Sequence, residues 1–269
     1  MTPHDLREHL DRVYTSYNRR EFLHPDPLEF LWRYNRAEDR EIVGLVASGL
    51  AYGRVAQILR STEKVLYALG SAPSEYLRSL SPGELDGKLS GFKHRFTIDS
   101  EMVALLKSVS ILQEKWGLLE NMFEAFLSGN SYLSALERFV SSILGNAGIK
   151  KSSLLPRPAL GSACKRLHLF MRWMVRSDEV DPGVWTSISP SILVIPLDVH
   201  MFRVARSLGF TERKNTTYKT ALEITESFRR INPDDPVKYD FALTRMGIQG
   251  LFNDTLFKQL FHAQTASST

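Results

Sequence analysis

Hydrophobic side chains recur every three or four residues along most of this 269-residue chain, which is the spacing of amphipathic helices. The clearest case is the segment 55–69, where one helix face would carry Ile58, Leu59, Thr62, Val65, Leu66 and Leu69. The same spacing predicts helices over residues 39–52, 99–112, 132–144, 163–176, 197–208, 217–230 and 237–247. No pair of alternating segments is joined by a hairpin turn, so the pattern predicts an all-α fold.

Helix ends are marked by capping residues, prolines and glycines. Asp26 precedes Pro27, an arrangement typical of an N-cap followed by a first-turn proline. Gly209 is expected to end the helix over 197–208, and the Asn-Pro-Asp-Asp-Pro run at 232–236 interrupts the next helical segment. A long loop is predicted over residues 145–163, which contain three glycines and two prolines.

Composition indicates an ordinary globular protein, with 43% hydrophobic and 24% charged residues. The first residues lack the apolar core of a signal peptide, and no apolar run is long enough to span a bilayer. We therefore expect a cytoplasmic protein without a membrane partner. The single cysteine, Cys164, excludes an internal disulfide, a cysteine-based zinc finger and a four-cysteine iron–sulfur cluster.

Positive charge is unevenly distributed, although the net charge is only +4. The segment 138–177 contains no Asp or Glu and eight basic residues, which are Arg138, Lys150, Lys151, Arg157, Lys165, Arg166, Arg172 and Arg176. Such an island favours a polyanionic partner, because clustered cations attract phosphates. The alternative is a solvated helix face, which is the commoner explanation of a charge run.

The basic island coincides with a loop that leads into a helix at Gly161-Ser162-Ala163. A glycine at this point lets main-chain amides approach a phosphate, and the helix N-terminus adds a positive dipole. An element of this kind would hold any duplex, because it contacts phosphate and not bases. The alternative is an ordinary turn. The predicted DNA contacts are Lys150, Lys151, Arg157, Gly161, Ser162, Ala163, Arg166 and Arg203.

Lys165 and Asp198 are the candidate catalytic residues. Lys165 falls in the first turn of a predicted helix, where the dipole disfavours a cation, so it either reaches solvent or serves as an amine nucleophile. Asp198 follows Pro196 at an expected N-cap. An aspartate there could simply cap the helix. It could also assist chemistry if its second oxygen faces a cleft.

The segments around these two residues resemble the helix-hairpin-helix DNA glycosylase superfamily. Residues 155–170 are similar to its hairpin and following helix, usually Leu-Pro-Gly-Val-Gly-x-Lys-Thr-Ala, and Lys165 matches the Schiff-base lysine of bifunctional members. Residues 197–203 are similar to Val-Asp-Thr-His-Val-x-Arg, and Asp198 matches the essential aspartate. The hairpin differs in reading Arg-Pro-Ala-Leu-Gly, and the iron–sulfur cysteines are missing.

Two further segments extend the resemblance to four regions between about residues 40 and 250. Residues 42–58 are similar to the helix–loop–helix of endonuclease III relatives, which implies that Ala51, Tyr52, Gly53 and Arg54 line the side where the base enters. Residues 241–247 are similar to the Trp-Leu-Ile-Leu-His-Gly helix of these enzymes, although the glutamine-rich loop is absent. Lys165 and Asp198 lie 33 positions apart, closer to the spacing in archaeal 8-oxoguanine DNA glycosylases.

The resemblance implies a two-lobed helical fold with a helix-hairpin-helix clamp on DNA. Lobe A would span about residues 30–130, and lobe B about 131–262 together with the N-terminal helix. The implied activity is base-excision repair by a DNA glycosylase with AP-lyase activity, removing an oxidised purine such as 8-oxoguanine through a lysine Schiff base. We expect a nucleoid-associated monomer that acts on damaged duplex DNA. The Lys165 and Asp198 segments are also similar to those of an uncharacterised, mainly bacterial family.

A cofactor is not expected, because the archaeal group also lacks the iron–sulfur cluster; the hairpin is a candidate site for a monovalent cation. For the base pocket the candidates are Tyr52, Arg54, Gln57, Asp240 and Phe241, with Trp185 as a further stacking residue. The alternative for the aromatic candidates is that they pack in the hydrophobic core. Asp240 is preferred for base reading, because it stands in an apolar helix and would be costly to bury unpaired. His200 and Arg203 are expected to brace Asp198 or a phosphate.

Two alternatives remain open. The chain could be a non-catalytic DNA-binding protein that keeps the clamp, or a helical protein that binds another protein through the basic face. Phosphate binding requires no carboxylate, so the Lys165–Asp198 pair argues against the first alternative. Steep salt dependence of DNA binding would argue against the second.

Overall fold

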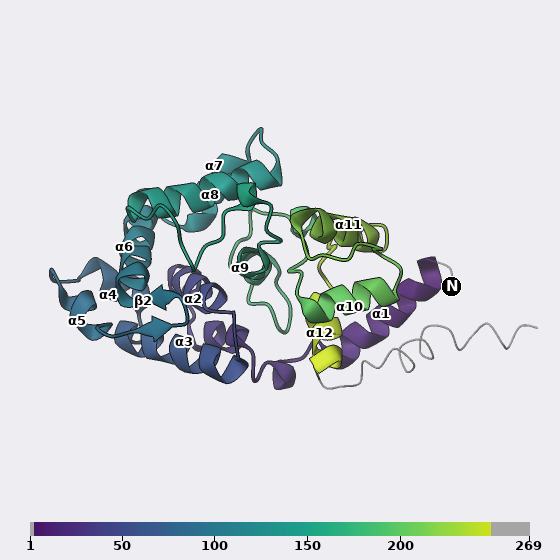
Figure 1. Ribbon diagram of the computed structural model, residues 1–269, viewed down its shortest axis with the longest axis horizontal. Helices are drawn as coiled ribbons and strands as arrows, with labels where there is room; N and C mark the ends of the chain where they lie inside the picture. Colours follow the sequence, from purple (N-terminus) through teal and green to yellow (C-terminus); the bar gives the residue numbers. More distant parts are fainter. Residues whose placement is uncertain (1–2, 249–269) are drawn as a thin grey trace, which may run out of the picture.

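A computed structural model describes residues 3–248 of the chain, and helices dominate this part (Figure 1). Its elements, in order, are α1 (Pro3–Tyr17), η1 (Arg20–Phe22), η2 (Pro27–Arg33), α2 (Ala37–Gly49), α3 (Val55–Leu69), α4 (Pro73–Arg78), α5 (Glu84–Lys88), β1 (Lys93–His94), β2 (Thr97–Ile98), α6 (Asp99–Trp116), α7 (Leu119–Leu127), α8 (Tyr132–Asn146), η3 (Pro158–Leu160), α9 (Lys165–Val175), η4 (Pro190–Ile192), α10 (Val199–Ser207), α11 (Tyr218–Arg229) and α12 (Asp240–Ile248). The predicted all-α class is confirmed for this region.

The helices gather in two groups with α9 between them (Figure 1). Helices α2 to α8 form one group, in which α8 packs on α6 and α7. The other group contains α10, α11 and α12, and α1 returns from the start of the chain to pack on α12. The expected lobe boundary near 131 falls between α7 and α8, which pack on each other. Residues 249–262 of the expected second lobe lie outside the described part.

Local sequence signals fixed several helix starts correctly. Helix α3 has the predicted bounds, and the Asp26 side chain accepts a hydrogen bond from the Leu28 amide at 3.0 Å. The element that follows Asp26 is a 3₁₀ helix rather than an α-helix. Among the described residues, no helix combines the length and apolar character needed to cross a membrane.

The expectation that hairpin-paired strands are absent was wrong. Strands β1 and β2 pair antiparallel, with Lys93 opposite Ile98 and His94 opposite Thr97. Each strand has two residues, too few for an alternating pattern to appear in the sequence. The hairpin instead depends on tertiary hydrogen bonds.

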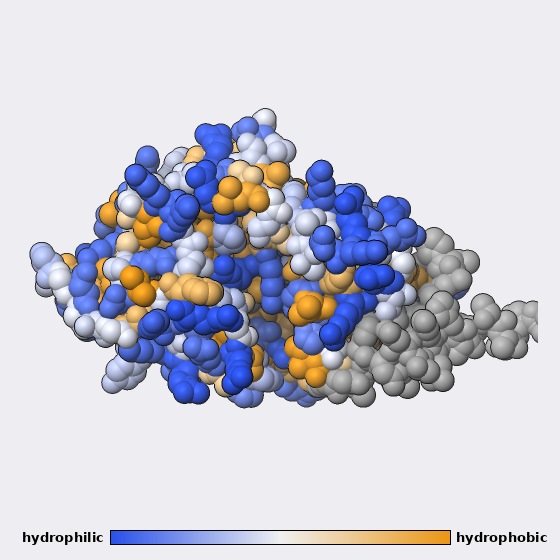
Figure 2. Space-filling view, viewed as in Figure 1, coloured by the Kyte–Doolittle hydropathy of each residue, from blue (hydrophilic) through white to orange (hydrophobic). Residues whose placement is uncertain are grey.

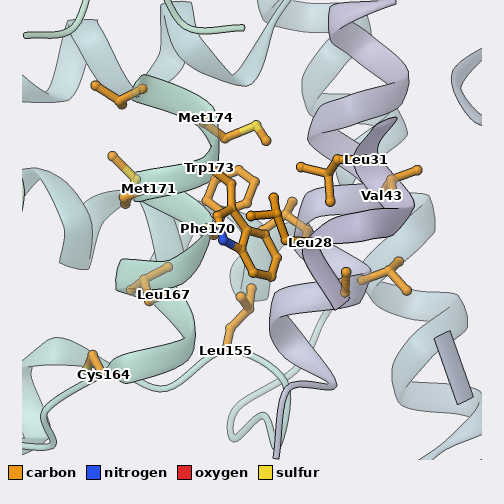
Figure 3. Packing of buried hydrophobic residues seen from close by; sticks show 14 of the residues in the cluster. Leu28, Leu31, Val43, Leu155, Cys164, Leu167, Phe170, Met171, Trp173 and Met174 are labelled. Carbon is orange, nitrogen blue, oxygen red and sulfur yellow. The ribbon is translucent and has the colours of Figure 1, made fainter. Parts of the chain in front are cut away.

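Helix α9 forms the centre of the hydrophobic core (Figure 3). Phe170 and Met174 are buried on the side of α9 that packs against α2. The two helices approach closely at Gly44, where an added Cβ would lie 2.9 Å from the end of the Met174 side chain and 3.3 Å from the Phe170 ring. A larger residue at 44 would therefore require the end of the Met174 side chain and the Phe170 ring to shift.

Buried Glu41 joins α2 to three other segments. Its carboxylate accepts hydrogen bonds from the Trp185 indole and the Gln113 amide, both at 2.8 Å, and from the backbone amides of Leu119 and Glu120 at 2.9 and 3.0 Å. Burial raises the pKa of Glu41 to about 7, while these donors act in the opposite direction. Trp185 is consequently a core residue, not a stacking platform for a ligand.

Arg172 of α9 and Arg176, the C-cap residue that follows α9, bind carboxylates of α12 and of the loop after α9. Arg172 donates to Asp181 at 3.1 Å and to Asp240 at the start of α12. Arg176 binds Asp181 as well, and reaches Asp178 at 2.9 Å. Both guanidinium groups are almost fully buried, so each carboxylate compensates a charge that would otherwise be costly to remove from water.

The same network extends to α1 and to the loop before α12. Arg176 donates to Asp235 at 2.8 Å, and the Tyr14 hydroxyl of α1 donates to Asp178 at 2.9 Å. Helix α9 is thus held on one side by apolar packing against α2 and on the other by ion pairs. Its N-terminus, which carries Lys165, is placed by both contacts.

His168 lies one turn after Lys165 and generates a pH prediction. Its ring is fully buried between Tyr132 and Tyr218, with Nδ1 3.0 Å from the Tyr132 hydroxyl. Desolvation lowers the pKa of His168 to about 3, against an ordinary value of 6.5. The unfolded chain therefore binds this proton first, and the stability that neutral His168 provides is lost as pH falls from about 6.5 toward 3.

Replacing this histidine with phenylalanine should weaken the acid sensitivity. Between pH 7 and pH 4.5 the unmodified protein should lose about 2 kcal/mol more unfolding free energy than His168→Phe, measured by urea unfolding. Equal losses in the two proteins would contradict a neutral buried His168.

Candidate active site

Lys165 is the first residue of α9, directly after a sharp turn. Cys164 adopts the left-handed conformation, with φ of 46°, and Gly161 does so as well, with φ of 75°. The loop between them is held by an isolated bridge from Ser162 to Thr217. Helix α9 therefore begins directly after this turn, and Lys165 lies at its N-terminus.

Asp198 is the N-cap of α10, and its two carboxylate oxygens have different partners. Oδ1 accepts hydrogen bonds from the amides of His200 and Met201 at 2.9 and 2.8 Å. Oδ2 lies 3.4 Å from the Nζ of Lys165. The capping interpretation and the chemical one are therefore compatible, because one oxygen serves each purpose.

A cavity of about 620 Å³ lies between the two helix groups, and both residues line it. This volume is within the usual range for small-molecule sites. The lining residues come from five regions of the chain: Pro25, Asp26, Pro27, Ala51, Tyr52, Gly53, Val55, Ile58, Lys165, Leu169, Arg172, Pro196, Asp198, Val199, His200, Asp240, Phe241, Thr244, Arg245 and Ile248. Lys165 and Asp198 therefore meet in a hollow that a ligand can enter.

Each Lys or Arg of the lining is paired with a lining carboxylate. The pairs are Lys165 with Asp198, Arg172 with Asp240, and Arg245 with Asp26. Three positive and three negative side chains leave the cavity without a strong excess of either sign. Lys165 is the most accessible of the three cations, with 36% of its side chain exposed, whereas Asp198 exposes 15%. The Lys165 side chain is therefore accessible from the cavity, whereas the Asp198 side chain is largely shielded from solvent.

Asp240 lines the cavity, but the reason given for its role was wrong. Its burial was expected to be costly without a partner, and Arg172 provides that partner. Burial raises the pKa of Asp240 to about 6, whereas Arg172 acts to lower it. The burial of Asp240 is explained by the core, and only its position in the wall still favours contact with a ligand.

The other base-pocket candidates divide between two hollows. Tyr52 and Phe241 line the cavity that contains Lys165. Arg54 and Gln57 line a different hollow, between α3 and the β hairpin. Val55 and Ile58 lie on the face of α3 that lines the first cavity, whereas Arg54, just before α3, and Gln57, on another face of this helix, line the second hollow.

The basic island does not form a continuous basic surface. Arg172 and Arg176 are buried in ion pairs, and Arg166 turns inward, where its guanidinium donates to the carbonyls of Gly49 and Ser153. Arg157 is exposed but bonded to Glu137 on α8. The carboxylates that balance Arg157, Arg172 and Arg176 lie outside residues 138–177 in the sequence, so the predicted basic surface is absent from this part of the structure.

The remaining predicted DNA contacts are less constrained. Lys150, Lys151 and Arg203 are exposed, as are Gly161 and Ser162 at the loop before α9. Ala163 is buried, so only its backbone could contribute to a phosphate site. His200, which was expected to brace Asp198, instead lines the cavity, and its backbone amide bonds the carboxylate.

Several lining residues were missed as functional candidates. Asp26 was identified as a helix cap, and Arg245 was not singled out, yet their side chains pair in the cavity wall at 2.7 Å. The sequence contained a usable signal, because Arg172 in α9 and Arg245 in α12 each follow a run of mostly apolar residues. Such positions favour a buried ion pair between helices.

Cys164 directly precedes Lys165. Cys164 is buried, and desolvation raises the pKa of its thiol to about 11, so it is a poor nucleophile. Among residues 3–248, no group of three or more His, Cys, Asp or Glu side chains is arranged to hold a metal ion.

Fold and site together define an all-α protein with an amine–carboxylate pair in a cavity between two helix groups. The family described as "Protein of unknown function (DUF2400)" matches residues 26–249, so the chain belongs to this family. The matched segment contains every lining residue of the cavity except Pro25. Searches of curated proteins and of solved structures found no match.

The capping role of Asp198 can be separated from its chemical role by two substitutions. Asp198→Ala removes both oxygens and should lower the free energy of unfolding by about 1 kcal/mol. Asp198→Asn keeps a capping oxygen and should stay within a few tenths of a kcal/mol of the unmodified protein. Chemical unfolding measures both; an alanine variant as stable as the asparagine variant would show that the cap contributes nothing.

Proposed function

We propose that this protein is a DNA glycosylase with AP-lyase activity that uses Lys165 as its nucleophile. The observation that supports this most directly is the 3.4 Å approach of the Lys165 amine to Asp198 in the wall of an open cavity. The two residues were selected from the sequence by their separate motifs, and they lie 33 positions apart. An amine with an adjacent carboxylate is the pair that imine chemistry on a sugar requires.

The cavity suits a nucleotide that has been extruded from a duplex. Its volume of about 620 Å³ accommodates a base with its sugar, and its paired charges suit an uncharged ring better than a row of phosphates. Tyr52 and Phe241 provide aromatic surface in the wall. Extrusion costs a few kcal/mol, and a damaged base pair lowers that cost.

The first chemical step is displacement of the base by the lysine. Asp198 accepts a proton from the Lys165 ammonium, which frees the nitrogen lone pair to attack C1′ of the deoxyribose. The glycosidic bond breaks as the new N–C1′ bond forms, and the base leaves with the bonding electrons and takes up a proton. Transfer of the proton from Asp198 to the departing base restores the Asp198 carboxylate, which stabilises positive charge on the sugar.

The second step opens the sugar and cleaves the strand. One of the two protons on the attached nitrogen passes to the ring oxygen as the bond between this oxygen and C1′ breaks, which gives a protonated imine between Lys165 and C1′ of the sugar. Loss of a C2′ proton then expels the 3′ phosphate by elimination. Water finally hydrolyses the imine and regenerates the lysine. An oxidised purine, in particular 8-oxoguanine, is the first lesion to test, because the Lys165–Asp198 spacing is closest to that of the archaeal 8-oxoguanine enzymes.

The second candidate is a non-catalytic protein that binds DNA through the loop before α9. The exposed Gly161 and Ser162 at that loop favour it. It leaves unexplained why an accessible amine and a carboxylate meet in a cavity, since phosphate binding needs no carboxylate. For this reason the catalytic proposal accounts for more of the site.

Substitution of Lys165 tests the proposal. Duplexes that each carry one lesion, including 8-oxoguanine and an abasic site, are incubated with enzyme and borohydride, which reduces an imine to a stable adduct. Lys165→Gln should give no adduct and no strand cleavage. Asp198→Asn should reduce cleavage by roughly 10²- to 10⁴-fold, the usual contribution of general acid–base catalysis.

Lys115→Gln is the matched control, because it removes an exposed lysine at the end of α6 that neither lines the cavity nor belongs to the predicted DNA contacts, and it should leave cleavage unchanged. All three variants should bind a duplex with an abasic-site analogue within about threefold of the unmodified protein. An adduct that persists at full yield in Lys165→Gln would remove this residue from the mechanism. Binding without cleavage or adduct on every lesion would favour the non-catalytic candidate.

A further inference from the structure

The hairpin that the sequence analysis missed carries an exposed aromatic residue beside the cavity. Arg95 and Phe96 form the turn between β1 and β2, and Phe96 has 76% of its surface exposed. Arg95 adopts a φ of 52°, which non-glycine residues seldom do. This side chain stands at the tip of an element whose base is anchored to the rest of the protein.

Hydrogen bonds fix the base of the hairpin to the wall of the cavity. His94 is fully buried, with Nδ1 2.9 Å from the Ser61 hydroxyl of α3 and Nε2 3.0 Å from the Tyr52 carbonyl. In return, the Tyr52 hydroxyl donates to the His94 carbonyl at 2.9 Å. Since Tyr52 also lines the cavity, the position of the hairpin is coupled to that of the site.

A second set of contacts supports the other strand and the turn. Thr97 lies 2.8 Å from the Tyr52 hydroxyl and 2.6 Å from Ser153, which in turn donates to Glu101. A Cβ placed on Gly53, another residue of the cavity wall, would lie 3.1 Å from the Arg95 side chain. The turn therefore sits directly against the cavity rim.

The hairpin and α3 enclose a hollow of about 610 Å³ that is lined by cations and by no carboxylate. Its lining residues are Arg54, Ala56, Gln57, Arg60, Ser61, Lys64, Gly91, Phe92 and Lys93. Two acids on adjoining elements are already engaged, because Glu63 binds Arg33 and Asp99 accepts from the Gly91 amide. Figure 2 shows hydrophilic side chains gathered over α3, at the lower left.

The two hollows adjoin at the start of α3, where Arg54 lines one and Val55 lines the other. A chain of phosphates is the ligand that four exposed cations in the wall of one hollow would bind. An aromatic tip next to such cations is the usual way to hold an unstacked or single-stranded segment, because every base offers a face for stacking. Together the features indicate one strand that passes from the cavity onto α3.

We define the α3–hairpin surface by Arg54, Arg60, Lys64, Lys93, Arg95 and Phe96. Resting on the proposed function, we propose that this surface holds the DNA strand that carries the extruded nucleotide. Phe96 stacks on a base beside the vacated position, and the cations contact the phosphates that follow. The main DNA-contact surface is thereby assigned to α3 and the hairpin, in place of the basic island.

Fluorescence anisotropy with a labelled duplex that carries a central abasic-site analogue tests the surface. Arg60→Gln/Lys64→Gln changes two cations that do not line the Lys165 cavity. It should reduce the slope of log affinity against log salt by about 2, one for each lost phosphate contact. Phe96→Ala should weaken binding roughly 5- to 100-fold without changing that slope, because it removes stacking and no charge. Phe96→Trp should restore tight binding.

The matched control is Lys115→Gln/Arg138→Gln, which removes two exposed charges near Trp116 and Phe126, at the ends of α6 and α7 far from α3. It should leave the salt slope within about 0.3 of the unmodified value. Thermal melting checks that each variant folds. Unchanged binding in both α3–hairpin variants would overturn the proposal, and so would an equal loss in the control, which would indicate general charge attraction.

The outcome is separable from that of the proposed function. A Lys165 adduct that forms while the α3–hairpin variants bind normally would sustain the glycosylase and reject this surface. Weakened binding in these variants with no adduct on any lesion would sustain the surface and reject the glycosylase. One more result would reject stacking beside a vacated position. The unmodified protein would bind an intact duplex as tightly as the abasic duplex, and Phe96→Ala would not weaken that binding.

Discussion

The buried ion pairs of Arg172 and Arg176 are the interaction on which the geometry of this protein depends. They connect α9 to the start of α12, to the loop after α9 and, through Asp178, to α1. Each guanidinium is almost free of solvent, so loss of one carboxylate would leave a buried charge without compensation. The ion pairs add directional contacts to the apolar packing of α9 against α2, and together these contacts set the position of α9.

That position places two helix N-termini at the same cavity. Lys165 begins α9, and Asp198 caps α10, with one oxygen on the backbone and the other toward the amine. The cap orients the Asp198 carboxylate through Oδ1 and leaves Oδ2 facing the Lys165 amine. A structural requirement of α10 and a chemical requirement of the proposed reaction are therefore met by the same side chain. This sharing explains how a short sequence motif can signal both a helix start and a site.

The sequence allowed the helices to be predicted wherever apolar spacing and caps act locally. The bounds of α3 and the capping roles of Asp26 and Asp198 needed no tertiary information. The choice of Lys165 and Asp198 as candidate catalytic residues came from the resemblance of their two segments. Their proximity depends on how α9 and α10 pack, so periodicity alone contains no information on it.

Features that depend on distant partners were predicted poorly. The β hairpin is stabilised by bonds from His94 and Thr97 to Tyr52, Ser61 and Ser153, and its strands are too short to leave a pattern. The basic island appeared to be a surface because charge was counted along the chain. In space, three of its arginines turn inward toward carboxylates or carbonyls. The four exposed cations that line one hollow lie instead just before α3, on α3 and on β1. They are Arg54, Arg60, Lys64 and Lys93, and they span forty positions of sequence.

The most direct measurement of the central claim is the location of the covalent bond between enzyme and DNA. The borohydride-reduced adduct with lesion-containing duplex is digested with protease and nuclease, and the modified peptide is sequenced by mass spectrometry. A deoxyribose-derived mass on Lys165 is the result that this account predicts. The same mass on another lysine or on the N-terminal amine, with Lys165 unmodified, would contradict it.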